Sequence, residues 1–116
     1  MKQEEKDLLL KDLCSRIPYG VRCRIEDPVM HDLSFILNGI IIDDDAVFLK
    51  HVYTVYYPKD IKPYLYPMSN MTEEQYKEYI KYSPIKAREY LNENHFDYNG
   101  LIEKGLALDA TNKNIY

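Results

Sequence analysis

Three histidines and a run of three aspartates are the residues best suited to metal binding or acid–base chemistry. His31, His51 and His95 lie far apart, and no pair has the spacing of a metal-binding motif. Successive residues of an extended segment point to opposite sides, so Asp43–Asp45 could converge on one cation only if the loop curled. We interpret this run as a solvated turn, and the sequence predicts no metal or other cofactor.

Nucleophilic side chains give an equally weak signal. Cys14 and Cys23 are predicted to face the core, where a thiol is unreactive. Ser69 and Ser83 lie in no nucleophile-elbow sequence, and the four glycines form no phosphate-binding loop. His95 is interpreted as a residue at a helix end, where its partial positive charge is favoured. The sequence therefore favours a protein that is not an enzyme, with a small metal-dependent hydrolase as one alternative.

Tyrosine is unusually frequent, with 12 residues against 3 phenylalanines and no tryptophan. Its ring is apolar and its tip is polar, so it suits half-buried positions and interfaces. Two arginines of one predicted strand share its solvent face and could act with nearby tyrosines. The resulting candidate interaction surface consists of Arg22, Arg24, Tyr53, Tyr56, Tyr57, Tyr64 and Tyr66.

The partner of this surface is predicted to be another protein or a second copy of the chain. An arginine–tyrosine sheet face could also bind single-stranded nucleic acid, and this is the other alternative. However, 15 basic against 19 acidic residues give a net charge of -4 and a pI near 5.3, which opposes general binding to a phosphate backbone. The favoured hypothesis is a non-enzymatic accessory protein that acts by protein–protein binding, for example on a host enzyme.

The elements that must position these residues begin with a helix over 3–17. Leu9, Leu13 and Ile17 recur at helical spacing, and Asp12 is assigned to the polar side. Pro18 and Gly20 end this helix.

The middle of the chain has the pattern of β-strands. Apolar and polar residues alternate over 21–27, and further strands are predicted over 33–37, 40–43 and 46–57, the last either continuous or broken in two. Asn38-Gly39 is a typical tight-hairpin sequence. The prediction is an antiparallel meander of three or four strands.

The segment 61–75 is interpreted as a connector. Pro63 and Pro67 each remove a backbone donor, which argues against a central strand. Thr72 and Gln75 then match a capping box that begins a helix reaching about residue 82. Ser83, followed by proline, begins a second helix over 84–93.

These elements predict an α+β fold in a single domain of 116 residues. It has an N-terminal helix, the antiparallel meander, two C-terminal helices and a tail over 101–110 docked on one sheet face. Residues 111–116 are predicted to be frayed. The first residues lack a signal-peptide pattern and the longest apolar run is too short for a membrane span, so the sequence predicts a cytoplasmic protein with no membrane partner.

Three segments carry a family resemblance: "LLLKDLCSRIPYGVRCRI" (8–25), "IKPYLYPMSNMTEEQ" (61–75) and "LNENHFDYNGLIEKGLALDA" (91–110). Together they resemble a group of small uncharacterised proteins of gut anaerobic bacteria and their prophages and mobile elements. Residues 27–57 are less similar. The resemblance implies a bacterial cytosol and a phage or mobile-element gene, and it assigns no activity or catalytic residue.

Overall fold

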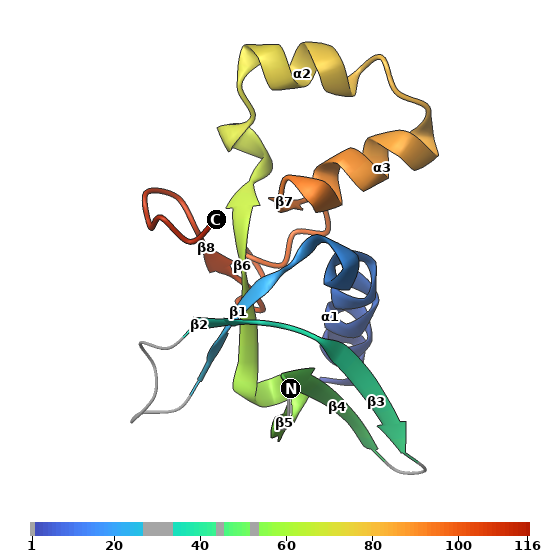
Figure 1. Ribbon diagram of the computed structural model, residues 1–116, viewed down its shortest axis with the longest axis vertical. Helices are drawn as coiled ribbons and strands as arrows, with labels where there is room; N and C mark the ends of the chain where they lie inside the picture. The colour runs from blue at the N-terminus through green and yellow to red at the C-terminus, as the bar shows by residue number, and fades with distance from the viewer. Residues whose placement is uncertain (1, 27–33, 44–45, 52–53) are drawn as a thin grey trace.

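An N-terminal helix, two β-sheets and a later pair of helices make up the fold, which is mixed α+β (Figure 1). The computed structural model describes residues 2–26, 34–43, 46–51 and 54–116. The α-helices are α1 (Gln3–Arg16), α2 (Glu73–Tyr79) and α3 (Pro84–Glu93), and the 3-10 turns are η1 (Ile17–Tyr19), η2 (Pro58–Asp60) and η3 (Met68–Asn70). The strands are β1 (Arg22–Ile25), β2 (Ser34–Ile36), β3 (Gly39–Asp43), β4 (Ala46–His51), β5 (Thr54–Tyr56), β6 (Ile61–Pro67), β7 (Phe96–Asp97) and β8 (Leu108–Asp109).

The strands belong to a five-stranded mixed sheet and a three-stranded antiparallel sheet. In the larger sheet β1 pairs antiparallel with β2 and β6, while β7 and β8 pair parallel with β6. The smaller sheet has the order β3-β4-β5. The step at Asn38-Gly39 therefore connects two sheets, and the prediction of a hairpin there is wrong because β2 pairs with β1 and β3 with β4.

Strand β6 is the centre of the larger sheet, so the interpretation of 61–67 as a connector is also wrong. Backbone groups of successive residues in a strand point to opposite edges. The Leu65 carbonyl accepts a hydrogen bond from the Ala110 amide at the β8 edge, so Pro63 and Pro67, two residues away on either side, share that edge. Strands β1 and β7 pair with β6 along its other edge. Their hydrogen bonds with β6 therefore do not need the amide protons that Pro63 and Pro67 lack.

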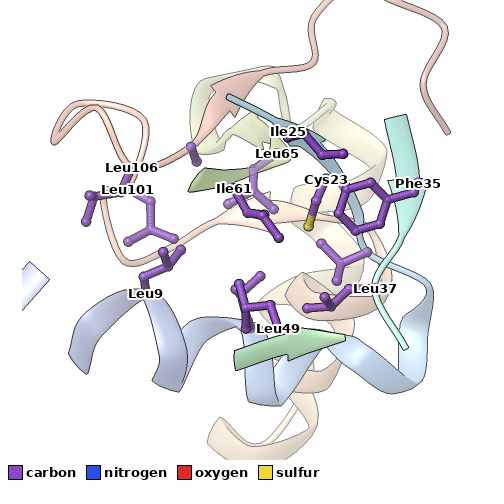
Figure 2. Packing of buried hydrophobic residues seen from close by; sticks show 13 residues of the cluster. Leu9, Cys23, Ile25, Phe35, Leu37, Leu49, Ile61, Leu65, Leu101 and Leu106 are labelled. Atoms are coloured by element: carbon purple, nitrogen blue, oxygen red, sulfur yellow. The ribbon is translucent and has the colours of Figure 1, made fainter. Parts of the chain in front are cut away.

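Helix α1 and both sheets enclose the hydrophobic core (Figure 2). The buried face of α1 consists of Leu9, Asp12, Leu13 and Arg16, at helical spacings of three and four residues. Leu9 and Leu13 pack with side chains from β1, β2, β4 and β6. Cys23 is buried in this core as predicted, whereas Cys14 lies off the buried stripe and is exposed, contrary to the prediction.

The segment after α3 also contributes to the core. Leu101, Leu106 and Ala107 belong to the core cluster, and β8 adds to the free edge of β6. The last residues contact other elements, in contrast to the predicted frayed end. Asn70 donates to the Thr111 hydroxyl, and the Tyr116 hydroxyl bonds to the backbone of β1 and β6.

Helices α2 and α3 form an antiparallel arm beyond one end of the larger sheet (Figure 1). Helix α2 contains no buried residue, and α3 buries only Leu91 and Asn92. The expectation that both helices cover a sheet face therefore does not hold for α2. Within the described residues, no helix combines the length and the hydrophobicity needed to cross a membrane.

Candidate interaction surface

Four of the seven predicted surface residues share one face of the larger sheet. Arg24 lies opposite Lys62 in the register of β1 and β6, so Arg22, Arg24, Tyr64 and Tyr66 alternate onto the same side. Arg24 forms an ion pair with Glu26 at 2.8 Å. The predicted grouping of arginine and tyrosine is therefore partly present, but one of its cations is paired.

The aromatic rings of this face are largely covered. Tyr64 is only 8% exposed, and the ring centre of Tyr116 lies 6.0 Å from that of Tyr66. The Tyr116 hydroxyl accepts from the Arg22 amide at 2.9 Å and donates to the Tyr64 carbonyl at 2.7 Å. In the register of β1 and β6, Arg22 and Tyr64 would form the next pair after Cys23 and Pro63. The Tyr116 hydroxyl bridges their backbone groups in place of a direct hydrogen bond. Because bases stack on exposed rings, this face gives little support to a single-strand nucleic-acid binder.

The other three predicted residues lie apart from this face. Tyr56 stacks on Phe35 with ring centres 5.4 Å apart and packs against the core. Tyr57 is 53% exposed, with the Lys59 ammonium 5.8 Å from its ring centre. Tyr53 lies outside the described residues. The described members of the candidate surface therefore do not form one exposed patch.

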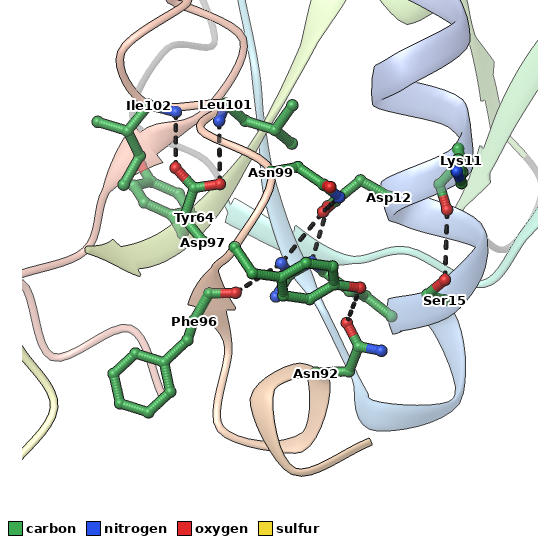
Figure 3. Close-up of polar contacts among 12 residues, drawn as sticks. Lys11, Asp12, Ser15, Tyr64, Asn92, Phe96, Asp97, Asn99, Leu101 and Ile102 are labelled. Carbon is green, nitrogen blue, oxygen red and sulfur yellow. Dashed lines mark hydrogen bonds and ion pairs between the residues drawn. The ribbon is translucent and has the colours of Figure 1, made fainter. Parts of the chain in front are cut away.

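A buried ion pair within α1 forms hydrogen bonds to the segment after α3 (Figure 3). The Arg16 guanidinium donates to both Asp12 carboxylate oxygens, at 2.7 and 3.1 Å, and to the Phe96 carbonyl at 2.6 Å. Asn99 donates to the same carboxylate at 2.9 Å. Asp12 is fully buried, so its assignment to the polar side of the helix is wrong.

Tyr98 extends this network. Its ring lies under two guanidinium groups, with Arg16 at 5.0 Å and Arg88 at 5.2 Å from the ring centre. Its hydroxyl donates to Asn92 at 2.7 Å. Asp12 and Arg16 follow Leu9 and Leu13 at spacings of three and four residues. This spacing alone could have predicted that both side chains lie on the buried face of α1. Since most of their polar atoms are paired within the fold, we assign the network a structural role.

His95 lies beside the network at the end of α3. Its φ of 62° places it in the left-handed region, in the position where a helix often ends on glycine or asparagine. Its ring stacks on Tyr116 with centres 3.5 Å apart. Burial and the nearby Arg16 charge lower the pKa of His95 to about 4. The helix-end position is as predicted, but the imidazole is neutral, so the predicted charge interaction is wrong.

A cleft of about 460 Å³ opens next to His95. Its polar lining is mostly engaged within the fold, because Thr72 and Gln75 form the α2 capping box and Asn94 donates to the Tyr90 carbonyl. In the part of the chain that the structure describes, no group of three histidine, cysteine or acidic residues could hold a metal ion. Asp44, Asp45 and His31 lie outside the described residues. Glu93 and His95 are the only acidic and histidine residues among those that line the cleft.

The low pKa of His95 predicts a pH dependence of stability. The unfolded histidine, with a pKa near 6.5, binds a proton before the folded one, so its contribution is complete above pH 6.5 and is lost as the pH falls towards 4. The ring is partly exposed, so we expect a loss of about 1–2 kcal/mol in the free energy of unfolding. The His95→Asn variant keeps a residue that tolerates positive φ and should lose less over this range. Urea unfolding of both proteins at several pH values measures the difference, and equal pH dependence would contradict it.

Among the described residues, the three most exposed large apolar side chains lie on the α2–α3 arm. Tyr76 of α2 and the C-cap residue Ile80, one helical turn apart, are 55% and 58% exposed, and Ile85 at the start of α3 is 77% exposed. Because the two C-terminal helices are predicted to dock on a sheet face, the exposure of these side chains is contrary to that prediction. Tyr76 and Ile80 lie on one face, as their helical spacing requires, but no element of the described fold covers that face.

Local interactions fix the shape of this arm. The Thr72 hydroxyl accepts from the Gln75 amide at 3.1 Å, and the Gln75 side chain accepts from the Thr72 amide at 2.9 Å, which confirms the capping box. Ser83 caps α3 as predicted. Tyr82, in the turn between the helices, donates to Glu78 at 2.6 Å and packs on the Tyr90 ring. The arm is therefore a defined surface.

A groove of about 560 Å³ lies between the two helices. Tyr79 and Ile80, at the C-terminal end of α2, line one side of it. Ala87 and Leu91 line it from α3, and Tyr98 also belongs to the lining. Grooves between helices are common sites for a partner's side chains, and the lining of this one combines apolar and polar groups.

No family model matches this chain, and no curated protein or solved structure shows significant similarity to it. The candidate interaction surface therefore has to be judged on its own geometry, and the α2–α3 arm meets the requirements of an interface better than the predicted arginine–tyrosine face.

Proposed function

We propose that the protein acts by binding another protein through the α2–α3 arm, as a small accessory protein that is not an enzyme. The observation that carries this proposal is that α2 buries none of its seven residues, while Tyr76 and the C-cap residue Ile80, one helical turn apart, are both exposed. A helix this short is not stable alone in water and normally gains its stability by packing an apolar face. A partner that covers the face would supply that packing.

The energetics of the exposed side chains support this role. Burying a large apolar side chain contributes about 1.5–3 kcal/mol, and interfaces depend on a few such anchors. Tyrosine is enriched among these anchors because its ring adds contact area at a small entropic cost. The resemblance to proteins of bacterial mobile elements makes a bacterial cytoplasm the proposed setting, and a host enzyme is one kind of partner.

The test compares a double variant with a matched control. Tyr76→Ser combined with Ile80→Ser should reduce partner retention at least about tenfold, because two anchors are removed. Tyr57→Ser removes a ring of similar exposure from another surface and should retain the partner like the wild type. The proteins recovered from a bacterial extract by each immobilised form are quantified by mass spectrometry, and light scattering of the purified chain detects self-association. Equal retention by all three forms, with a monomeric chain, would refute the proposal.

A further inference from the structure

The charges of the chain are divided between the end of the arm and the rest of the protein. Residues 77–88 contain four basic residues, Lys77, Lys81, Lys86 and Arg88, and one acid, Glu78. The remaining residues contain eleven basic and eighteen acidic side chains. All four cations are exposed. The free end of the arm is therefore positively charged on a protein that is otherwise acidic.

The excess of positive charge is confined to the free end of the arm, because Glu73, Glu74, Glu89 and Glu93 lie towards the other ends of the two helices. Lys77 approaches Glu73 of its own helix at 3.8 Å, an exposed contact that neutralises little. The Glu78 carboxylate accepts from the Tyr82 hydroxyl, and the Lys86 ammonium lies 4.8 Å from the Tyr82 ring centre. Glu89 follows Arg88 on α3, towards the acidic end of that helix.

The groove borders this basic region, and Arg88 is the one cation among its lining residues. Ile80, Ala87 and Leu91 provide apolar contacts, while the Arg88 guanidinium borders the groove and stacks on Tyr98. Lys81 and Lys86 stand on either side of the turn that joins the two helices. A groove that offers these apolar contacts, with Arg88 in its lining and Lys81 and Lys86 near the same end of the arm, is complementary to a segment with an apolar face and acidic flanks.

We infer that the arm binds an acidic amphipathic segment of its partner, with aliphatic or aromatic side chains in the groove and carboxylates facing Lys81, Lys86 and Arg88. This inference rests on the proposed function and specifies the chemistry of the partner. It favours a protein segment over nucleic acid, because Ile80 and Ile85 are exposed aliphatic side chains that a phosphate backbone would not cover. It also favours a different chain over a second copy, because two basic arm ends would repel each other.

The test is a selection of displayed random peptides on the immobilised full-length protein. We expect the enriched peptides to combine Asp and Glu with Leu, Ile or Phe at helical spacing, and to bind several-fold more weakly at high than at low salt. The variant K81E/K86E should select peptides poor in acids and bind the original peptides at least about tenfold more weakly. Circular dichroism of the variant checks that the exposed substitutions leave the fold intact.

The outcomes separate this inference from the proposed function. Enriched peptides that are neutral or basic, yet lose binding in the Ile80→Ser variant, would overturn the inference and leave the proposed function in place. Peptides whose binding ignores both Ile80→Ser and Tyr76→Ser would contradict both. A single-stranded oligonucleotide that binds more tightly than any selected peptide, and loses binding in K81E/K86E, would identify nucleic acid as the partner and overturn the inference.

Discussion

Replacing Arg16 with methionine should lower the free energy of unfolding by about 3–5 kcal/mol, the largest effect that we expect from a single substitution. The guanidinium is fully buried and bonds to Asp12 and to the Phe96 carbonyl. Its removal leaves the Asp12 carboxylate without its cation in the core, with Asn99 as the remaining donor. Chemical denaturation with urea measures the loss, and a decrease below about 1 kcal/mol would contradict it.

The matched control replaces both partners. Asp12→Leu combined with Arg16→Met removes both charges and fills similar volumes, so the double variant should be more stable than Arg16→Met alone. Its remaining cost is the unpaired Asn99 amide and Phe96 carbonyl, about 2 kcal/mol. A double variant that is no more stable than the single one would show that packing around Arg16, and not its charge pair, holds α1 to the C-terminal segment.

Local patterns predicted several elements correctly because each depends on neighbouring residues. The alternation at Val21, Cys23 and Ile25 gave a strand with a buried face, and all three side chains are buried. The Thr72–Gln75 capping box and the Ser83 cap placed the starts of α2 and α3. Caps and periodicity act within one or two helical turns, so they can be read without knowledge of the fold.

The sheet arrangement could not be read in the same way. Whether Pro63 is tolerated in β6 depends on which edge its missing amide faces, and that follows from pairing with β1 and β8, which are distant in sequence. Asn38-Gly39 has the composition of a hairpin, but β2 and β3 find different partners. Non-local pairing overrides local turn preference when it buries more apolar surface.

The candidate site was predicted only in part for a similar reason. The number of tyrosines indicated an interface, but their exposure depends on what packs over them. Tyr64 is buried, and its carbonyl accepts a hydrogen bond from the Tyr116 hydroxyl, whereas Tyr76 is exposed on α2, which contains no buried residue. The contact between Tyr64 and Tyr116 could not be predicted from local patterns, because the two residues are far apart in the sequence. The four cations within 77–88 can be counted in the sequence. That they lie at the free end of an exposed pair of helices depends on the fold.

Replacing Asp97 with alanine should lower the free energy of unfolding by about 2–4 kcal/mol, the second of the two largest effects. The buried carboxylate accepts from the amides of Leu101 and Ile102, each at 2.9 Å. Without it both amides lack an acceptor, and the turn that brings Leu101 and Leu106 into the core loses its anchor. Amide hydrogen exchange should therefore accelerate over residues 100–107 before it does in α1.

Two further variants separate this anchoring role from a general effect of losing an acidic residue. Asp97→Asn keeps one carbonyl acceptor and the size of the side chain, so it should lose about half as much stability. Asp109 makes the same kind of contact with the Thr111 amide, but it is exposed, so Asp109→Ala should cost less than about 1 kcal/mol. Equal destabilisation by Asp97→Ala and Asp109→Ala would contradict this prediction. It would show that burial does not strengthen the hydrogen bonds of Asp97, and that the 97–102 turn does not anchor the C-terminal segment.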